Sequence, residues 1–340
     1  MNTIVLMIFF ATGLLSWWLV GKLIIFLKKH QIVDVENERS SHHGSVPRGG
    51  GLVIVGILIF IILAMSLISN RSEVFIGLGI LLTAWGALSW WDDRNDLSAR
   101  KRLVFQMFIA ISTLFAFGYI TSLQISNVLF INLPYVGVVI TFVGVLWMAN
   151  LYNFMDGIDG LAASQTIIAS ITLAFWFWQA GDQHFAFLCL LLSAASYGFL
   201  IWNWQPAKIF LGDVGSITLG AFFATLIIFA NTRYQIPVIS FVLLFSVFVL
   251  DATTTILIRL FKGEKVWLPH RSHYYQRITN SGVHHRSVVI VQIILMLLCS
   301  IIASLTVLDH DRIGLSVGLI FLLFFISVAI VKYIERKYLV

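Results

Sequence analysis

The sequence predicts an all-α integral membrane protein that crosses the bilayer about eleven times. Of its 340 residues, 59% are hydrophobic and only 11% are charged, and the mean hydropathy is +0.93. Soluble domains of this length do not combine so many apolar residues with so few charges. Cys189 and Cys299 both lie inside apolar runs, which argues against a disulfide framework or a zinc site.

The expected helices follow in order from eleven apolar windows, each close to the roughly 20 residues that cross ~30 Å of hydrocarbon. The first window has no basic residue ahead of it, which distinguishes it from a cleaved signal peptide and predicts a first span. No soluble domain interrupts the series, so residues 1–340 are expected to form a single polytopic membrane domain. The windows cover about 3–27, 50–69, 74–91, 103–120, 134–151, 161–180, 184–202, 215–231, 236–258, 287–307 and 313–331.

The distribution of Lys and Arg predicts the orientation. Eighteen of them lie in alternate connections and in the C-terminal tail, whereas the other connections hold only Arg71, Arg233 and Arg312. Because cytoplasmic loops carry the excess of positive charge, the N-terminus is expected in the periplasm and the C-terminus in the cytoplasm. This asymmetry accounts for the net charge of +6, so no nucleic-acid partner is expected. The active site is then expected on the cytoplasmic loops 28–50, 91–103, 151–161, 203–215 and 259–287.

Acidic residues gather on the same predicted side, next to the ends of the spans. Carboxylates near a bilayer are costly and are retained there mainly for function. The adjacent Asp92 and Asp93 can share a cation or perturb each other's protonation, and the basic run that ends at Arg102 can hold phosphate oxygens. A basic membrane anchor with acidic neighbours explains this cluster about equally well.

The segment NLYNFMDGIDGLAAS gives the sharpest indication of function. Its polar residues recur every three positions, along one helix face or the rim of a turn: Asn150, Asn153, Asp156 and Asp159. Gly157 and Gly160 permit a tight backbone and close approach of a ligand. A capped helix start needs only one of the four polar residues. The stripe therefore favours a site for a hydrated divalent cation and a phosphate.

Two further aspartates lie at the eighth and ninth windows. Asp213 stands between two glycines in FLGDVGS; as an N-cap it would be structural, and a helix N-terminus also attracts anionic groups, so both roles can hold. For Asp251, inside the ninth window, a functional role and a structural pairing with a cation or polar backbone are equally expected.

The longest inner connection, KGEKVWLPHRSHYYQRITNSGVHHR, combines Arg and His side chains that favour a pyrophosphate contact: His270, Arg271, His273 and Arg277. His284 and His285, beside the next span, are expected to face lipid headgroups. Near the N-terminus, Asp34 and the segment ERSSHHGSVPRGGG form a glycine-rich basic loop that can wrap phosphate, with Arg39, His42 and Arg48.

The chain resembles the polyprenyl-phosphate N-acetylhexosamine-1-phosphate transferases (glycosyltransferase family 4) over nearly its whole length. Six segments in a fixed order carry the resemblance: SSHHGSVPRGGG, WWDDRNDLSARKR, NLYNFMDGIDGLAAS, FLGDVGSITLG, DATTTILIRL and PHRSHYYQR. The family includes bacterial enzymes that start enterobacterial common antigen and many O-antigens, and phospho-N-acetylmuramoyl-pentapeptide transferase. Eleven spans with an outside N-terminus are similar to the O-antigen-initiating branch. The resemblance implies a multi-pass protein of the bacterial inner membrane with its active site facing the cytoplasm.

The resemblance also implies roles for individual residues. Asp213 and Asn153 match a Mg²⁺ site, in which Mn²⁺ could substitute. The expected catalytic residues are Asp92, Asp93, Asp156 and Asp159, and their division into base, nucleophile and positioning group stays open. By the same resemblance Arg102, Arg271 and His273 are expected to bind substrate, and the segments described above add Arg48, Asn150 and His270.

One segment departs from the family pattern. The initiating enzymes carry Asp-Arg-x-His-x-His-His late in the chain, whereas this sequence reads HRSHYYQ from His270, with Tyr275 and Gln276 in place of the last two histidines. The departure argues against the peptidoglycan reaction. It leaves both GlcNAc and a deoxy N-acetylhexosamine open as the donor sugar.

The expected reaction is transfer of a sugar 1-phosphate from a UDP-N-acetylhexosamine to undecaprenyl phosphate, with release of UMP. It would be the first membrane step of O-antigen or cell-surface polysaccharide synthesis, and a homodimer stays open. The main alternative is a multipass transporter of a phosphorylated metabolite, which would place polar residues near mid-membrane, often in repeated halves. A CDP-alcohol phosphotransferase would need a longer Asp-Gly-x-x-Ala-Arg pattern, and a structural scaffold leaves the Asn/Asp stripe unexplained.

Overall fold

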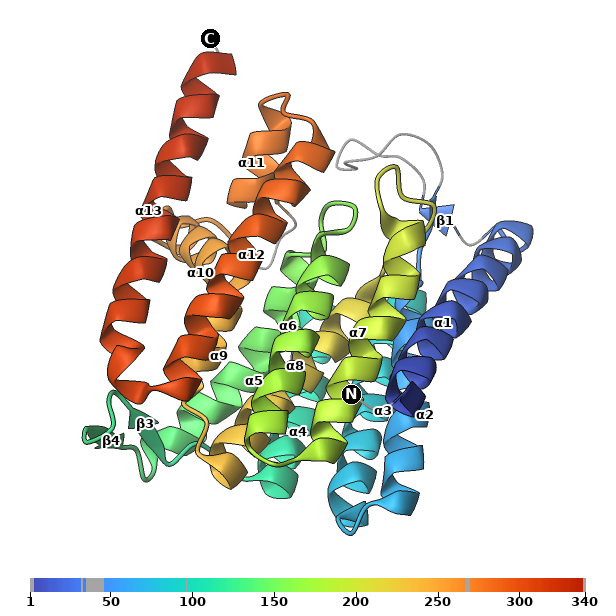
Figure 1. Ribbon diagram of the computed structural model, residues 1–340. Coiled ribbons are helices and arrows are strands. Elements are labelled where there is room, and N and C mark those ends of the chain that lie inside the picture. The colour runs from blue at the N-terminus through green and yellow to red at the C-terminus, as the bar shows by residue number, and fades with distance from the viewer. Residues whose placement is uncertain (1–2, 32, 35–45, 96, 267–269, 339–340) are drawn as a thin grey trace.

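Long helices dominate the computed structural model, which describes residues 3–31, 33–34, 46–95, 97–266 and 270–338. Most of them run side by side, with their connections gathered at two ends of the bundle (Figure 1). The predicted fold class, an all-α integral membrane protein, is confirmed. The helices are α1 (Thr3–Lys29), α2 (Gly51–Ile68), α3 (Ser72–Asn95), α4 (Ala99–Phe117), α5 (Val136–Phe154), α6 (Leu161–Gln179), α7 (Gln183–Asn203), α8 (Asp213–Tyr234), α9 (Val238–Leu244), α10 (Ser246–Phe261), α11 (Tyr274–Asn280), α12 (His285–Leu308) and α13 (Ile313–Tyr338), with a 3₁₀ turn, η1 (His310–Arg312).

Each of the eleven predicted windows contains helix, but the number of crossings stays a prediction. Within the described residues, nine single helices are long and apolar enough to cross a membrane, and a bent pair makes a tenth candidate. α4 differs because its first turn holds the basic run that ends at Arg102. Only residues 103–117 remain for its apolar part, which is about 22 Å of helix at 1.5 Å per residue.

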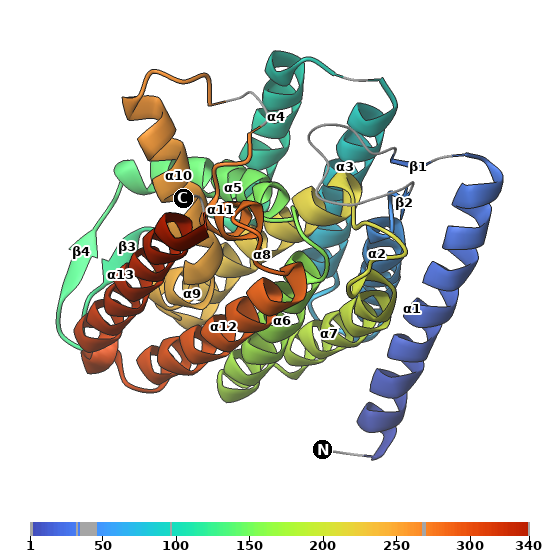
Figure 2. The ribbon, with the colours of Figure 1, turned by 90° about the horizontal axis from the view of Figure 1, so that it is seen from above.

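The ninth window does not form the single straight helix that was predicted. α9 and α10 are bent by 84° at a break that includes Phe245. Both halves are apolar, so hydropathy cannot reveal the break. The Phe245 ring is buried and packs against Phe223 and Tyr152, at centroid distances of 5.0 and 6.5 Å. Figure 2 shows α10 leading away from α9 toward the edge of the bundle.

Two short strand pairs accompany the helices and were not predicted. β1 (Val33–Asp34) pairs with β2 (Val46–Pro47), and β3 (Ser122–Gln124) pairs with β4 (Phe130–Asn132), both antiparallel. Strands of two or three residues are too short for a periodicity signal. The β3–β4 hairpin joins α4 to α5, and Asn127 at its tip donates a 2.7 Å hydrogen bond to Asp311 in η1.

α8 lies at the centre of the bundle (Figure 2) and is the most deeply buried of the nine candidate spans. It packs against α2, α3, α4 and α5. Glycines allow the closest contacts: a Cβ on Gly51 would lie 2.3 Å from the Cα of Gly215, and one on Gly220 would lie 2.4 Å from the carbonyl oxygen of Met148. Larger residues would push these helices apart, so the position of Asp213 at the start of α8 is closely determined.

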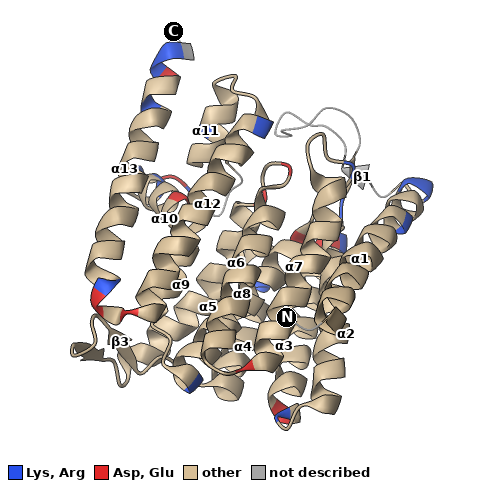
Figure 3. Ribbon diagram, in the orientation of Figure 1, with Lys and Arg blue, Asp and Glu red and all other residues tan. Residues whose placement is uncertain are grey.

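Charged residues lie mainly toward the two ends of the helices (Figure 3). At the end opposite the C-terminus, Arg71 donates hydrogen bonds to Asp182 (2.9 Å) and to the hydroxyl of Tyr234 (2.8 Å). The buried carboxylate of Asp182 also accepts hydrogen bonds from Tyr234 and from the backbone of Phe185. This cluster joins the α2–α3 turn, the α6–α7 turn and the end of α8. A buried charge is stable only with such partners.

Candidate active site

The predicted acidic residues meet at one end of the bundle, at the last turn of α3, the α5–α6 turn and the first turn of α8. Asp213 is the first residue of α8, and Gly212 occupies the N-cap position without a side-chain hydrogen bond. The N-cap interpretation of Asp213 is therefore wrong. Its side chain still lies at the N-terminal end of α8, the positive end of the helix dipole.

Arg48 links two of the acidic clusters. Its guanidinium donates a hydrogen bond to Asp213 and lies 3.8 Å from Asp93 Oδ1. The backbone places it there: Phe210 N donates to Pro47 O at 2.9 Å, and the amides of Gly49 and Gly50 donate to Phe210 O at 3.1 and 2.8 Å. The glycine amides are thus engaged by the loop before α8. In this segment a phosphate would therefore be bound by the Arg48 guanidinium and not by the glycine amides.

The adjacent aspartates at the end of α3 have different partners. Asp92 is buried, accepts a 3.0 Å hydrogen bond from Arg102, and accepts another from the backbone of Leu97 at 3.1 Å. Asp93 interacts electrostatically with Arg48 and with Asp213. The structure therefore brings Asp93, but not the carboxylate of Asp92, into direct contact with the Arg48 cluster.

The Asn/Asp stripe divides between several elements. Asn153 Oδ1 accepts a 2.9 Å hydrogen bond from Ser216, one turn after Asp213 on α8. Asp159 Oδ2 accepts one of 2.9 Å from Ala207 N in the α7–α8 loop. Asn150 instead donates to Gln106 of α4, at 3.0 Å. The structure thus brings Asn153 to the first turns of α8, uses Asp159 to hold a loop, and directs the Asn150 amide toward α4.

Asp156 lies in the α5–α6 turn between these groups. Loss of water around its carboxyl group raises its pKa well above the ordinary value, and the nearby carboxylates Asp213 and Asp159 raise it further. Arg48 and a hydrogen bond with the backbone of Gly212 oppose this effect. Several carboxylates therefore share one electrostatic environment with Arg48, an arrangement in which an added cation is strongly favoured.

The donor atoms of this cluster fit Mg²⁺ bound partly by substrate. Among the residues that the structure describes, no three His, Cys, Asp or Glu side chains converge as a closed metal site. Mg²⁺ commonly takes one or two carboxylates, several waters and substrate phosphates, all through oxygen. The carboxylate of Asp213 and the side-chain amide oxygen of Asn153 supply such oxygens near one another. The predicted pair is thus chemically suitable for a magnesium–phosphate site.

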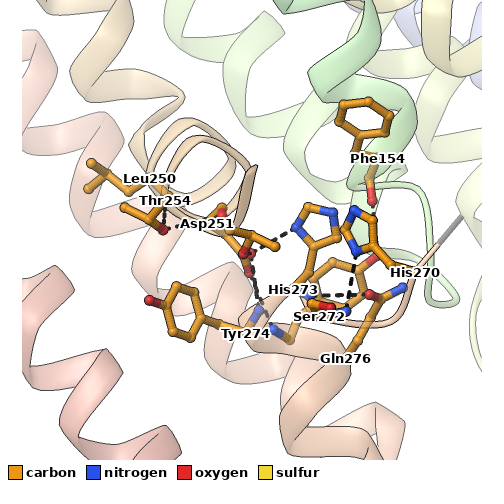
Figure 4. A network of polar contacts seen from close by, with 11 residues as sticks. Phe154, Leu250, Asp251, Thr254, His270, Ser272, His273, Tyr274 and Gln276 are labelled. Atoms are coloured by element: carbon orange, nitrogen blue, oxygen red, sulfur yellow. Dashed lines mark hydrogen bonds and ion pairs between the residues drawn. The ribbon is translucent and has the colours of Figure 1, made fainter. Parts of the chain in front are cut away.

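The segment from His270 to Asn280 packs beside the α5–α6 turn (Figure 4). Tyr275 is buried and its hydroxyl donates a 3.0 Å hydrogen bond to the carbonyl oxygen of Phe154, at the end of α5. Gln276 Oε1 accepts from the backbone of His273 at 3.3 Å and caps α11. The residues that replace the family's last two histidines therefore make contacts within the protein. Arg39 and His42 lie outside the described residues.

Three structural residues of this region were not identified from the sequence. Asn203 Oδ1 accepts from Gly160 N and its Nδ2 donates to Ile209 O, both at 2.9 Å, so it joins the Asp-rich turn to the loop before α8. Gln106 is the partner of Asn150. Glu335 of α13 accepts two 2.7 Å hydrogen bonds from Arg277 of α11. Asn203 could have been identified from the sequence, because it is a polar residue directly after an apolar window.

Fold and site together define a multi-pass membrane protein with a carboxylate–arginine cluster at one end of its helices. The model of glycosyl transferase family 4 matches residues 74–231. A probable undecaprenyl-phosphate N-acetylglucosaminyl 1-phosphate transferase of Bacillus subtilis (strain 168) is 30% identical over 310 residues, which cover 86% of this chain and 81% of the relative.

Two phospho-N-acetylmuramoyl-pentapeptide-transferases are also similar. That of Geobacillus sp. (strain WCH70) is 30% identical over 270 residues, 74% of this chain and 82% of the relative. That of Neisseria meningitidis (serogroup C / serotype 2a, strain FAM18) is 26% identical over 299 residues, 76% of this chain and 81% of the relative. The chain belongs to glycosyl transferase family 4, as its motifs predict.

Proposed function

We propose that the protein transfers a sugar 1-phosphate from a UDP-N-acetylhexosamine to undecaprenyl phosphate, with Mg²⁺ as cofactor. The observation that carries the proposal is the convergence of Arg48, Asp93 and Asp213 from three segments far apart in the sequence. Joining two polyanions requires cations that offset phosphate repulsion, and carboxylates that hold a metal ion against those phosphates. The names of the relatives describe transferases of this kind.

The reaction is a phosphoryl displacement. An oxygen of the lipid phosphate forms a bond to the β-phosphorus of the UDP-sugar. The bond between that phosphorus and the oxygen bridging to the α-phosphorus breaks, so UMP leaves with the bridging oxygen. The product is a polyprenyl diphosphate sugar. Charge and positioning carry most of the catalysis in such a step.

The residues of the cluster divide these tasks. Asp213 and Asn153 would hold Mg²⁺, which when bound neutralises charge on the pyrophosphate. Arg48 is about half exposed and can exchange its carboxylate partners for phosphate oxygens. Asp93 orients the lipid phosphate, and Asp92 with Arg102 fixes the end of α3 beside it. Asp156 and Asp159 shape the turn under the nucleotide.

The finer assignments follow the family and the loop composition. The site faces the cytoplasm of a bacterial inner membrane, the donor sugar is GlcNAc or a deoxy N-acetylhexosamine, and the product starts an O-antigen or another surface polysaccharide. A transporter is less well supported, because the acidic residues gather at one end of the bundle instead of its middle.

Purified protein in detergent, supplied with undecaprenyl phosphate, Mg²⁺ and a panel of UDP-sugars, tests the proposal through UMP release and lipid labelling. Asp213→Ala is expected to lower turnover by roughly 1000-fold, the several kcal/mol that a bound metal ion supplies. Asp311→Asn, which removes an exposed acid in η1, is the matched control and should retain wild-type turnover.

The outcomes separate the reaction from the metal assignment. Sugar-dependent UMP release that EDTA abolishes would establish the reaction and identify the donor. Near-normal turnover of Asp213→Ala at saturating Mg²⁺ would overturn the metal assignment alone. If folded wild-type protein, identified by a cooperative thermal transition, releases no UMP with any sugar of the panel, the proposed reaction is overturned.

A further inference from the structure

Asp251 of α10 is the acceptor at the centre of Figure 4. Its carboxylate accepts hydrogen bonds from three successive residues at the start of α11: from Nδ1 of His273 (3.0 Å), and from the backbone amides of Tyr274 (3.1 Å) and Tyr275 (3.3 Å). Thr255 adds a fourth, at 3.3 Å. The one acidic side chain of α10 is thereby compensated, and the start of α11 is fixed to α10.

His273 is enclosed by its neighbours, with only 2% of its surface exposed. Because its Nδ1 faces a carboxylate, that nitrogen carries the proton and donates it. Its ring lies 4.9 Å from the His270 ring, 5.8 Å from that of Tyr275 and 6.3 Å from that of Phe154, measured between centroids. A side chain packed in this way supports its neighbours, and of the two histidines it is the less accessible to a ligand.

His270 is the more accessible of the two. Its Nδ1 accepts a 3.3 Å hydrogen bond from the backbone of Ser272, so in the neutral ring the proton is on Nε2. Burial lowers its pKa to about 4, and the electrostatic influence of His273 and of Arg259 acts in the same direction. At physiological pH the ring is therefore a neutral donor through Nε2–H.

The same segment is also tied to the Asp-rich turn. The hydroxyl of Tyr275 binds the carbonyl oxygen of Phe154, two residues before Asp156. Asp251 thus holds one side of the start of α11, and the end of α5 holds the other. His270, whose ring contacts that of His273 at a tilt of 31°, is carried on this fixed support beside the proposed active site.

We propose that Asp251 and His273 are positioning residues that hold His270 so that its Nε2–H donates a hydrogen bond to the nucleotide-sugar. The inference rests on the proposed function, and it gives His270 and His273 different tasks. His270 contacts the donor substrate. His273 acts through His270, and Asp251 acts through His273 and through the two backbone amides that it holds at the start of α11.

Steady-state kinetics of single and double variants test whether Asp251 and His273 act together on binding of the UDP-sugar. Asp251→Ala and His273→Ala are each expected to raise the KM for the UDP-sugar roughly 10-fold, the effect of losing a hydrogen bond with a charged partner, with little change in the KM for undecaprenyl phosphate. The rise in KM of the double variant should be smaller than the product of the two single rises, because both side chains hold the same segment. Asp251→Asn, which keeps an acceptor oxygen, should recover most of the loss.

Thr254→Val is the matched control on α10. Among the residues that the structure describes, its hydroxyl bonds only within its own helix, to the carbonyl oxygens of Leu250 and Asp251, so wild-type kinetics are expected. A rise in KM of the double variant equal to the product of the two single rises would overturn the inference, since Asp251 and His273 would then act independently. An equal rise in KM for both substrates would also overturn it, because that is the result of general loosening.

Hydrogen–deuterium exchange supplies a test that needs no turnover. Asp251→Ala and His273→Ala should increase deuterium uptake in peptides covering residues 270–280, whereas Thr254→Val should not. Unchanged uptake in both variants would refute the positioning role. If no UDP-sugar is turned over by wild type but the uptake changes as expected, the proposed function fails and the positioning of this segment stands.

Discussion

Gly157 offers a sharp test of how the Asp-rich turn meets α11. A Cβ on Gly157 would stand 2.0 Å from the hydroxyl oxygen of Tyr275 and 3.0 Å from the ring carbon that bears it. Ordinary contacts of a Cβ begin near 3.4 Å, so Gly157→Ala must move the hydroxyl by 1.4 Å (3.4 − 2.0). That movement breaks the 3.0 Å hydrogen bond from Tyr275 to the carbonyl oxygen of Phe154.

The expected cost has two parts. Overpacking of a fitted contact costs about 1–3 kcal/mol. Loss of a buried hydrogen bond adds about 1 kcal/mol. Gly157→Ala is therefore expected to lower the free energy of unfolding by about 2–4 kcal/mol. Turnover should fall as well, because the turn that carries Asp156 is displaced.

A second substitution makes the argument specific. Tyr275→Phe alone leaves the Phe154 carbonyl without its donor and should cost about 1–2 kcal/mol. Combined with Gly157→Ala it removes the worst overlap and leaves the 3.0 Å contact to the ring and a 3.3 Å contact to Nε2 of Gln276. The double variant should therefore be more stable than the sum of the two single effects predicts.

Thermal unfolding in detergent, followed by intrinsic fluorescence, measures these differences. Gly144→Ala, on the same helix as Phe154, is the control and should melt at or slightly above the wild-type temperature, because an added Cβ there would have nothing within 4 Å and alanine is favoured over glycine inside a helix. The reasoning is refuted if Gly157→Ala also melts like wild type, or if the effects of Gly157→Ala and Tyr275→Phe are simply additive.

Two further predictions concern stability. Arg71→Leu leaves the fully buried carboxylate of Asp182 without its cation and should cost about 3 kcal/mol; in the double variant Arg71→Leu/Asp182→Leu, the melting temperature should largely recover, and a further fall would contradict the charge argument. The pKa of His270 is about 4 in the folded chain and 6.5 ordinarily, so the unfolded chain binds the proton first and stability should fall as the pH drops from about 6.5 toward 4. His270→Gln should flatten this part of the melting-temperature profile, and an unchanged profile would show that other groups cause it.

The helices could be predicted because the hydropathy of each span depends only on the residues of that span. All eleven windows contain helix, and the positions of the acids at helix ends follow directly from those boundaries. The 84° bend between α9 and α10 could not be predicted, because it depends on how the Phe245 ring packs against residues from α5 and α8. The β3–β4 hairpin could not be predicted because strands of three residues are too short to show a periodic pattern.

The site could be predicted as a set of residues but not as a set of contacts. Sequence spacing put Asn150 on the same stripe as Asn153, yet a helix side can face different neighbours at its two ends, and Asn150 turns to Gln106 of α4. The pairing of Arg48 with Asp213 joins positions 165 residues apart. The packing of α2 against α8 through Gly51 brings those two segments together, and so do the backbone hydrogen bonds of Pro47, Gly49 and Gly50 with Phe210.

The replaced histidines show why composition alone cannot assign specificity. Tyr275 and Gln276 stand where the family carries its last two histidines, and a substrate-contact interpretation would give both changes to the donor sugar. In the structure Tyr275 is buried against Phe154 and Gln276 caps α11. Both substitutions therefore affect, in the first place, how firmly residues 270–280 are packed against the rest of the protein. Any change of donor preference must then be transmitted through the side chains that the segment presents, of which His270 is the most distinctive because it replaces the aspartate of the family pattern.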